Sequence, residues 1–411
     1  MRLLLCPDSF KECLPARQVA EHIANGIRRI RSADEIKIVP LADGGEGTVS
    51  SLVDATGGTM VWLKVHDPLM REIDSFMGIL GDGTTAVIEM ASASGLALLK
   101  PGERDPWITT SFGTGELIKH ALDKGCRKII IGVGGSATND GGMGAATALG
   151  VRFLDENGRA LSPGGGSIGR LAEIDRSGLD TRIRACTIYV ACDVTNPLTG
   201  NEGASLVYGP QKGADTAMAE RLDNNLRHYA GHLKKYLGKD IEHIPGSGAA
   251  GGLSAGLMAF ADASIRPGFD LVSEITDLAA WITWADLVIT GEGKIDFQTP
   301  FGKTVFGVAS LAKNCGKPVI AIAGTLGEGY EIMIEKGIQC MVSIADKPMS
   351  LADAMKNAGT LIEDTAERIF RLLQLGAGLS VVPSSQEDHQ VVKQHGKGGQ
   401  SRDNIGISGP F

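Results

Sequence analysis

Short apolar runs along the chain alternate with polar, glycine-containing loops, and five of these runs share one pattern. Each run of mainly Ile, Leu, Val and Ala ends in a loop that pairs a carboxylate with glycine or a small hydroxyl residue. The five segments are LLLCPDSFK (3–11), IKIVPLADGGEGT (36–48), KIIIGVGGSATNDGG (128–142), IYVACDVTNP (188–197) and DLVITGEGKID (286–296). Such runs are typical of fully buried parallel strands, which deliver their loops to the sheet edge where ligands of open α/β folds bind. The pattern predicts an α/β enzyme with a shared site for a metal and a phosphate.

The remaining periodicity predicts further helices and strands. The chain opens with a β-α-β unit, in which a helix at 16–31 has its apolar residues on one face. Strands are expected at 2–6, 36–41, 60–65, 74–80, 84–90, 128–133, 187–192, 287–290, 319–323 and 340–344. Helices are also expected at 49–55, 113–124, 141–149, 215–237, 253–263 and 351–375.

A sheet that begins at residue 2 and resumes near residue 286 indicates a discontinuous domain that a second domain interrupts. We expect residues 1–64 and 265–376 to form the first domain and residues 65–264 to form the inserted one. The segment 377–411 is polar and aperiodic, so a disordered tail is expected there.

Composition narrows the class of protein. The 411 residues include 56 glycines, about twice the usual share, and most of them cluster at the ends of predicted strands. A net charge of −8 without a basic block argues against a nucleic-acid surface. The seven cysteines are scattered, no CxxC occurs, and neither a signal peptide nor an apolar stretch of membrane-spanning length is present. We therefore expect a cytoplasmic protein with reduced cysteines and no membrane contact.

Two common phosphate-binding motifs have partial matches in the chain. A Walker A loop that ends at Gly302-Lys303-Thr304 would need glycine where Phe297 stands, so that reading fails. The segment 246–251 matches GxGxxG, with Asp270 about 20 residues beyond it, but a poor strand precedes it. Three interpretations of these glycines remain open: a dinucleotide site, the start of a helix near an anion, or close contact between chain segments.

The first two strand-end loops carry candidate ligands. Asp8, Ser9 and Lys11 could bind a small hydroxy acid, with Lys11 facing its carboxylate or a transferred phosphoryl group; the alternative is a helix cap and a solvated lysine. The loop 43–48 holds three glycines and two acids, more than a plain turn needs. Asp43 is therefore a candidate metal or substrate ligand.

The third loop, at 134–142, has glycine pairs on both sides of four polar residues. Its main-chain amides and Ser136 or Thr138 could hold a phosphate, and a helix from 143 would add its positive end.

The last two loops each present a carboxylate after an apolar strand. Asp193 stands where a general base would be presented, with a cap or an Asx turn as the alternative. Glu292 and Asp296 could coordinate Mg²⁺ and Lys294 could face phosphate, or the loop could simply be solvated.

Taken together, the motifs resemble the type I glycerate kinases of bacteria. The similarity runs in the right order from residue 1 to about 376 and rests on PDSFKE (7–12), LADGGEGT (41–48), GTGEL (113–117), GGSATNDGG (134–142), ACDVTNPL (191–198), GPQKGA (209–214), GAAGG (248–252) and TGEGKID (290–296). The resemblance implies two α/β domains, one Rossmann-like with a parallel sheet and discontinuous, and an active site in the cleft between them. It also implies ATP-dependent phosphorylation of D-glycerate, most often to 2-phosphoglycerate, in glyoxylate or aldarate breakdown, with ATP and Mg²⁺ as cofactors.

The resemblance further implies roles in a reaction that depends mainly on positioning and charge neutralisation. Asp193 is expected to accept the proton of the glycerate hydroxyl, while Lys11 and Lys294 offset negative charge. The expected binding residues are Asp43 and Asp296 for Mg²⁺, Gly134, Gly135 and Ser136 for the nucleotide phosphates, and Asp8, Ser9 and Asn196 for glycerate. Exchanges of role among the four aspartates stay open.

Two other classes of protein compete with the kinase. A nicotinamide-dependent dehydrogenase would rest on the glycines at 246–251, and a non-catalytic sensor of hydroxy acids or nucleotides would use the same pockets without turnover. The phosphorylated hydroxyl, and whether the protein is a monomer or a homodimer, are not determined by the sequence.

Overall fold

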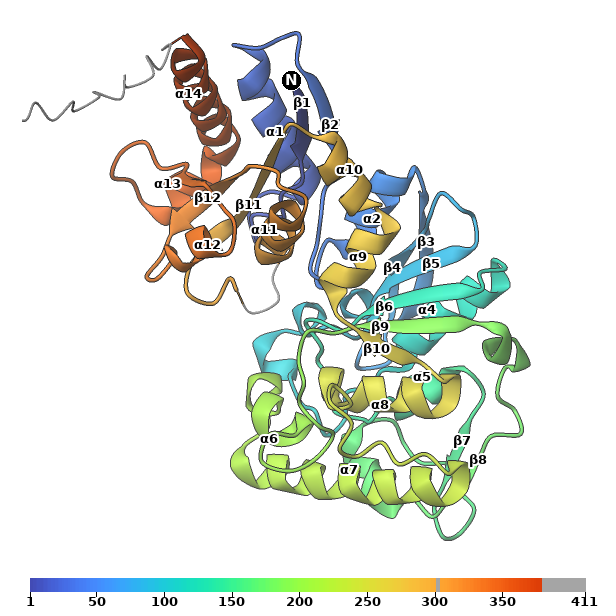
Figure 1. Cartoon of the computed structure of the whole chain (residues 1–411). Helices are drawn as coiled ribbons and strands as arrows, with labels where there is room; N and C mark the ends of the chain where they lie inside the picture. The colour runs from blue at the N-terminus through green and yellow to red at the C-terminus, as the bar shows by residue number, and fades with distance from the viewer. Residues whose placement is uncertain (301–303, 379–411) are drawn as a thin grey trace, which may run out of the picture. The chain divides into compact units, whose positions relative to one another are not determined.

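A five-stranded sheet forms the first structural layer of the chain. The computed structural model describes residues 1–300 and 304–378, and the features discussed below belong to the unit Met1–Arg371. The strands lie in the order β13 (Cys340–Ser343), β12 (Val319–Leu326), β11 (Leu287–Ile295), β1 (Arg2–Leu5) and β2 (Glu35–Ile38). Every pairing is parallel, and Leu3 of β1 lies opposite both Leu287 and Ile36. Figure 1 labels β12, β11, β1 and β2 of this sheet. The N-terminal strand is therefore an interior strand of a sheet that the last third of the chain completes.

A second, six-stranded sheet is built from the middle of the chain. Its order is β10 (Ser264–Arg266), β9 (Thr187–Ala191), β6 (Lys128–Gly132), β5 (Thr85–Glu89), β4 (Glu72–Ile79) and β3 (Thr59–His66). The pairings from β10 to β5 are parallel, whereas β5–β4 and β4–β3 are antiparallel. A small antiparallel ribbon, β7 (Arg152–Leu154) with β8 (Glu173–Asp175), stands apart from both sheets.

Helices connect the strands. The α-helices are α1 (Ala16–Arg28), α2 (Thr48–Thr56), α3 (Ala91–Ser94), α4 (Phe112–Asp123), α5 (Met143–Ala148), α6 (Ala204–Tyr208), α7 (Thr216–Leu237), α8 (Ala249–Ala261), α9 (Gly268–Ile275), α10 (Leu278–Trp284), α11 (Thr304–Asn314), α12 (Ile332–Glu335), α13 (Leu351–Lys356) and α14 (Ala358–Gly378). Five 3₁₀ turns supplement them: η1 (Leu96–Leu98), η2 (Pro101–Glu103), η3 (Gly165–Arg170), η4 (Thr181–Ala185) and η5 (Pro210–Lys212). Among the described residues, no helix has the length and apolarity to span a membrane.

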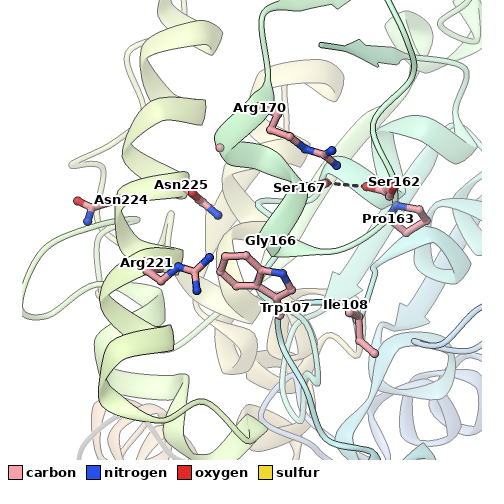
Figure 2. Close-up of a pocket in the computed structure, with 11 residues that line it drawn as sticks. Trp107, Ile108, Ser162, Pro163, Gly166, Ser167, Arg170, Arg221, Asn224 and Asn225 are labelled. Carbon is pink, nitrogen blue, oxygen red and sulfur yellow. Dashed lines mark hydrogen bonds between the residues drawn. The ribbon is translucent and has the colours of Figure 1, made fainter.

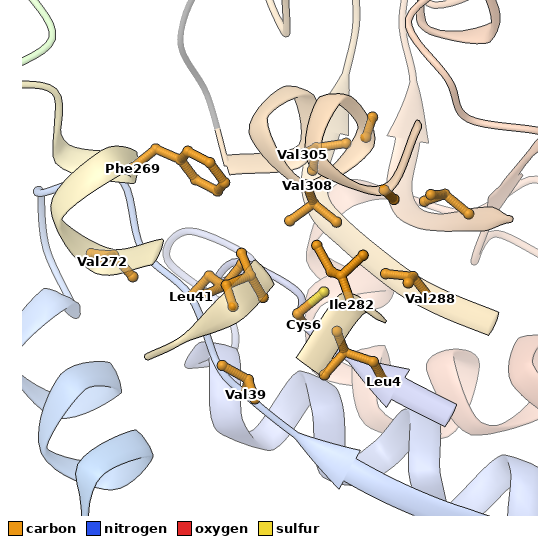
Figure 3. Packing of buried hydrophobic residues seen from close by; sticks show 14 of the residues in the cluster. Leu4, Cys6, Val39, Leu41, Phe269, Val272, Ile282, Val288, Val305 and Val308 are labelled. Atoms are coloured by element: carbon orange, nitrogen blue, oxygen red, sulfur yellow. The ribbon is translucent and has the colours of Figure 1, made fainter. Parts of the chain in front are cut away.

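Side-chain alternation along β1 assigns its residues to two different cores. Leu3 and Leu5 pack with the apolar faces of α1 and α14, whereas Leu4 and Cys6 pack on the other face with α9, α10 and α11 (Figure 3). The cluster around Leu4 continues through α2 to Val87 and Ile130 of the second sheet. One apolar core therefore extends from the first sheet to the second, while a separate core lies between the second sheet and helices α4, α5 and α8.

The predicted α/β class with parallel sheets is confirmed, and four details differ. The five expected strands are parallel but divide between two sheets, and β2 is partly exposed because it is an edge strand. The strand expected at 287–290 extends to Ile295 because it pairs with β12 along this whole length. The single helix expected at 351–375 is two helices, because Asn357 leaves helical geometry and its side chain bonds the carbonyl of Asp353.

The chain leaves the first sheet after β2 and returns to it at β11. This path agrees with an insertion, but the division into domains stays a prediction. The predicted boundary between residues 64 and 65 falls inside β3, which belongs to the second sheet. The tail predicted at 377–411 lies outside the described residues, apart from Ala377 and Gly378 at the end of α14.

Candidate active site

Four of the five predicted strand-end loops line one cavity of about 800 Å³. These loops follow β1 and β2 of the first sheet and β6 and β9 of the second. Six predicted site residues lie on its wall: Lys11, Asp43, Gly134, Gly135, Ser136 and Asp193. The predicted loops therefore meet at one cavity, which lies at the strand ends of two sheets instead of one.

The loop after β1 places one carboxylate behind the cavity wall and one amine on it. Asp8 is 6% exposed, and its carboxylate accepts hydrogen bonds from the Thr304 hydroxyl at 2.6 Å and from the main-chain N–H of Ser9 at 2.6 Å. Burial and the neighbouring Asp43 carboxylate raise the pKa of Asp8 to about 6. The Nζ of Lys11 lies 3.6 Å from Asp43 Oδ2, and this carboxylate is the main cause of a raised Lys11 pKa. Lys11 is therefore a fully charged cation at the cavity.

The loop after β2 is shaped by close contact with the second sheet. Gly44 has φ +88°, and a Cβ on Gly132 at the end of β6 would lie 2.3 Å from the Gly44 carbonyl oxygen. Behind the loop, Glu89 accepts a hydrogen bond from the N–H of Val49 at 2.8 Å, and burial raises the pKa of Glu89 to about 7. Gly44 and Gly132 thus allow the strand ends of the two sheets to approach each other.

The loop after β6 is held from behind by a buried carboxylate. Asp140 is fully buried and accepts hydrogen bonds from the N–H and hydroxyl of Ser111 at 2.8 and 2.9 Å and from the N–H groups of Gly142 and Gly144. Gly134, Gly135 and Ser136 face the cavity, whereas Thr138 is 0% exposed and is not among its lining residues. Of the two hydroxyls proposed for phosphate binding, only that of Ser136 is placed for it.

The loop after β9 presents a carboxylate whose orientation is fixed. Asp193 Oδ1 accepts a hydrogen bond from the N–H of Gly268 at 2.9 Å. Burial, together with the carboxylates of Asp43 and Asp270, raises the pKa of Asp193 to about 6, although the bond from Gly268 opposes the shift. A pKa in this range suits a general base that must be unprotonated near neutral pH.

Five predicted site residues do not line the cavity: Asp8, Ser9, Asn196, Lys294 and Asp296. Asn196 accepts a hydrogen bond at 2.7 Å from the hydroxyl of Tyr208, which does line it, so Asn196 positions a cavity residue. Lys294, near the end of the extended strand β11, forms an ion pair at 2.9 Å with Asp296, which directly follows the strand. The placement of these residues leaves their predicted roles untested.

Sequence reasoning missed several cavity residues, among them Glu89, Tyr208 and Lys212. Glu89 ends an apolar strand without a glycine loop after it, so it lacked the pattern used for the search. Lys212 lies in GPQKGA, a motif that supported the family resemblance but received no role.

The GxGxxG match at 246–251 is explained by close contacts between segments. A Cβ on Gly248 would lie 2.1 Å from the Pro197 carbonyl oxygen, and one on Gly251 would lie 1.9 Å from that of Thr138. No strand leads directly into this turn, since the described element before it is helix α7. The dinucleotide alternative therefore loses its structural basis.

A second cavity, of about 590 Å³, is separate from the predicted residues (Figure 2). Its wall includes Trp107, Arg170 and Arg221, with the Arg221 guanidinium 4.2 Å from the centre of the Trp107 ring. No carboxylate, histidine, cysteine or lysine is among its described lining residues, so it offers no general base.

The carboxylates at the cavity allow only limited metal binding by the protein itself. Within 1–300 and 304–378, no group of three or more His, Cys, Asp or Glu residues is arranged to hold a metal ion. Mg²⁺ in phosphoryl-transfer sites usually takes only one or two protein carboxylates and completes its shell with phosphate and water oxygens. Asp43 on the cavity wall fits that requirement.

Comparisons with known proteins agree with the fold. The model of the Glycerate kinase family matches residues 3–374. The chain is 50% identical over 367 residues to a protein named Glycerate kinase from Halalkalibacterium halodurans, which covers 89% of this chain and 97% of the relative. It is 48% identical over 376 residues to Glycerate 2-kinase from Escherichia coli K12, which covers 92% and 99%. A crystal structure from Salmonella typhimurium LT2, described as a glycerate kinase 2, matches with a TM-score of 0.84 at 48% identity over 92% of this chain and 100% of the other.

These matches define the class of protein, a phosphotransferase with an α/β fold. The chain belongs to the glycerate kinase family, and it is an enzyme.

Proposed function

We propose that this enzyme transfers the terminal phosphoryl group of ATP to D-glycerate and forms 2-phosphoglycerate. The relative named Glycerate 2-kinase, which matches over 92% of this chain, supports the choice of the 2-hydroxyl. The observation that carries the proposal is the single cavity whose wall holds Asp193, Lys11 and the segment 134–136. These would provide a base, a cation and a phosphate-binding backbone, which are among the recurring parts of phosphoryl-transfer sites.

In the proposed reaction, Asp193 acts on the acceptor hydroxyl of glycerate. As the hydroxyl oxygen forms its bond to the terminal phosphorus, its proton passes to the Asp193 carboxylate. The bond between that phosphorus and the bridging oxygen breaks, and the electron pair leaves with ADP. Because Oδ1 is held by the N–H of Gly268, Oδ2 is the oxygen available for the proton.

The remaining predicted residues bind and neutralise the reactants. We assign glycerate to Asp8, Ser9 and Asn196, and the nucleotide phosphates to Gly134, Gly135 and Ser136. Lys11 and Lys294 offset negative charge on the reactants. Asp43 and Asp296 are the proposed ligands of Mg²⁺, which would neutralise phosphate charge when bound.

The setting of the reaction is also part of the proposal. We place the enzyme in the cytoplasm, in the breakdown of glyoxylate or aldarates, as a monomer or homodimer that acts on small molecules only. All seven cysteines lie in the described chain and are free, in keeping with a reducing compartment. A closing motion of two domains around the reactants would exclude water and suppress ATP hydrolysis.

The decisive experiment is an ADP-release assay with Mg²⁺, ATP and D-glycerate, with the product identified by ³¹P NMR. We expect turnover that depends on glycerate and a signal from the 2-phosphate. A 3-phosphate would correct the regiochemistry alone. A folded protein that binds ATP but shows no turnover with glycerate would favour another hydroxy acid or the sensor alternative.

A further inference from the structure

Lys212 is a lysine that the fold buries at the cavity. It ends η5 and is only 1% exposed, yet it is among the residues that line the cavity. Gly213 follows with φ +102°, and a Cβ there would lie 2.1 Å from the carbonyl oxygen of Arg104. The chain can turn so tightly after Lys212 only because glycine stands there, and this turn keeps the lysine inside.

The amine of Lys212 is tied to the loop that we assign to the nucleotide phosphates. Its Nζ donates a hydrogen bond to the main-chain carbonyl of Thr138 at 2.7 Å. Thr138 follows Ser136 by two residues, and Lys212 lines the same cavity as the segment 134–136. An ammonium has three donors, and this contact uses one of them.

Lys212 lacks a carboxylate partner among the described residues. Its ammonium makes no ion pair there, and the nearby Asp140 carboxylate is already bonded by Ser111, Gly142 and Gly144. Burial lowers the pKa of Lys212 to about 7, and Asp140 opposes the shift only in part. A buried cation without a counterion is unfavourable unless another anion supplies the missing charge.

We propose that Lys212 is a further catalytic residue, whose ammonium binds an oxygen of the terminal phosphate of the nucleotide while it remains bonded to the Thr138 carbonyl. This inference rests on the proposed function, because it assumes that the 134–136 segment faces nucleotide phosphates. The terminal phosphate is then the counterion of Lys212. Lys212 in turn stabilises negative charge on the phosphoryl group during its transfer to glycerate. The opposing interpretation is that Lys212 only tethers the Thr138 carbonyl.

Calorimetric titration of ATP and ADP in the absence of glycerate separates the two interpretations. We expect Lys212→Met to weaken ATP binding by about 10- to 100-fold, the value of a lost charge-assisted hydrogen bond. ADP binding should change much less, since ADP lacks the terminal phosphate. An equal loss for both nucleotides would indicate a tether and overturn the proposal. Lys124→Met, the same change at an exposed residue after α4, is the matched control and should leave both affinities unchanged.

Proton uptake provides a second readout. In the free enzyme above pH 7 the Lys212 amine is largely uncharged, so ATP binding should draw a proton onto it. ATP titrations in two buffers of different ionisation enthalpy measure this uptake, which Lys212→Arg should abolish while keeping a positive charge. The cavity groups Lys11, Asp43, Glu46, Glu89 and Asp193 are common to both proteins. Unchanged uptake in Lys212→Arg would overturn the proposal, even if Lys212→Met failed to fold.

Turnover completes the test. Lys212→Met should lower kcat by about 100-fold or more, as removal of one donor to a developing charge does, with the KM for glycerate near that of the wild type. A wild-type enzyme inactive with glycerate would defeat the proposed function. The ATP and ADP titrations need no turnover, so they still decide the role of Lys212.

Discussion

The carboxylate of Asp193 is oriented by a hydrogen bond of 2.9 Å from the main-chain N–H of Gly268. Gly268 begins α9 and also abuts the other acidic loop, since a Cβ on it would lie 2.1 Å from the Asp43 carbonyl oxygen. One glycine therefore sets the positions of the proposed base and the proposed metal ligand together.

Asp193→Asn should lower kcat by about 100- to 10,000-fold, because a positioned general base contributes that much to proton transfer. The amide can still accept the Gly268 N–H bond, so the loop should keep its structure. ADP release with ATP and D-glycerate measures the effect. Near-normal turnover would remove Asp193 from the role of base.

The wild-type rate should depend on pH through the same carboxylate. The base works only when unprotonated, and the pKa of Asp193 is about 6, so kcat/KM for glycerate should rise through pH 6 to a plateau. Asp270→Asn removes one of the charges that raise this pKa, so the midpoint should move to lower pH with the plateau retained. A midpoint that does not move would argue that another group controls the rise.

Gly268→Ala should impair folding and activity together. The added methyl collides with main-chain atoms of Asp43, and overpacking of this kind costs about 1–3 kcal/mol of unfolding free energy. Urea unfolding and the ADP-release assay measure both effects. The control is Gly231→Ala within α7, where a Cβ meets nothing within 4 Å, so the helix should gain about 1 kcal/mol and activity should not change.

Asp8→Asn should make the protein more stable at pH 8 and less active. The folded-state pKa of Asp8 is raised from 3.8 to about 6, so folded protein binds the proton more tightly and stability falls as pH rises between these values. Removing the charge should therefore raise the unfolding free energy by about 1–3 kcal/mol at pH 8, with little change below pH 4. Asp346→Asn, at an exposed position, should show neither effect.

Asp43→Asn should raise the Mg²⁺ concentration needed for half-maximal activity by at least about tenfold. Loss of a group that only hydrogen-bonds a metal's ligand already lowers metal affinity by about this factor. Asp43 already lies on the cavity wall, where phosphate oxygens would complete the metal's shell. Because Asp296 is the second proposed ligand, Asp296→Asn should raise the required Mg²⁺ concentration in the same way. Normal Mg²⁺ dependence in that variant would restrict the site to Asp43.

The sequence predicted individual strands and their end loops better than the way in which the strands pair into sheets. Apolar runs ending in acid and glycine identified β1, β2, β6, β9 and β11, because each strand carries its signal within ten residues or so. The division of these strands between two sheets depends on pairings between residues far apart, which no local pattern encodes. Lys212 was missed for a related reason: its burial results from a turn against Arg104 and a bond to Thr138. A lysine that looks solvated in the sequence can thus be an internal group in the fold.

The pairing of Leu3 with Leu287 has a consequence for synthesis on the ribosome. At roughly 5–20 residues per second, β1 is exposed for about 15–60 s before β11 exists to cover its second edge. During that interval β1 has only β2 beside it, and a two-stranded ribbon is marginal in water. All six strands of the second sheet, which ends at Arg266, are made before Leu287. A chain that ended between Arg266 and Leu287 would contain every strand of the second sheet, but β1 of the first sheet would have an unpaired edge. The nascent enzyme therefore relies on its last third to cover β1.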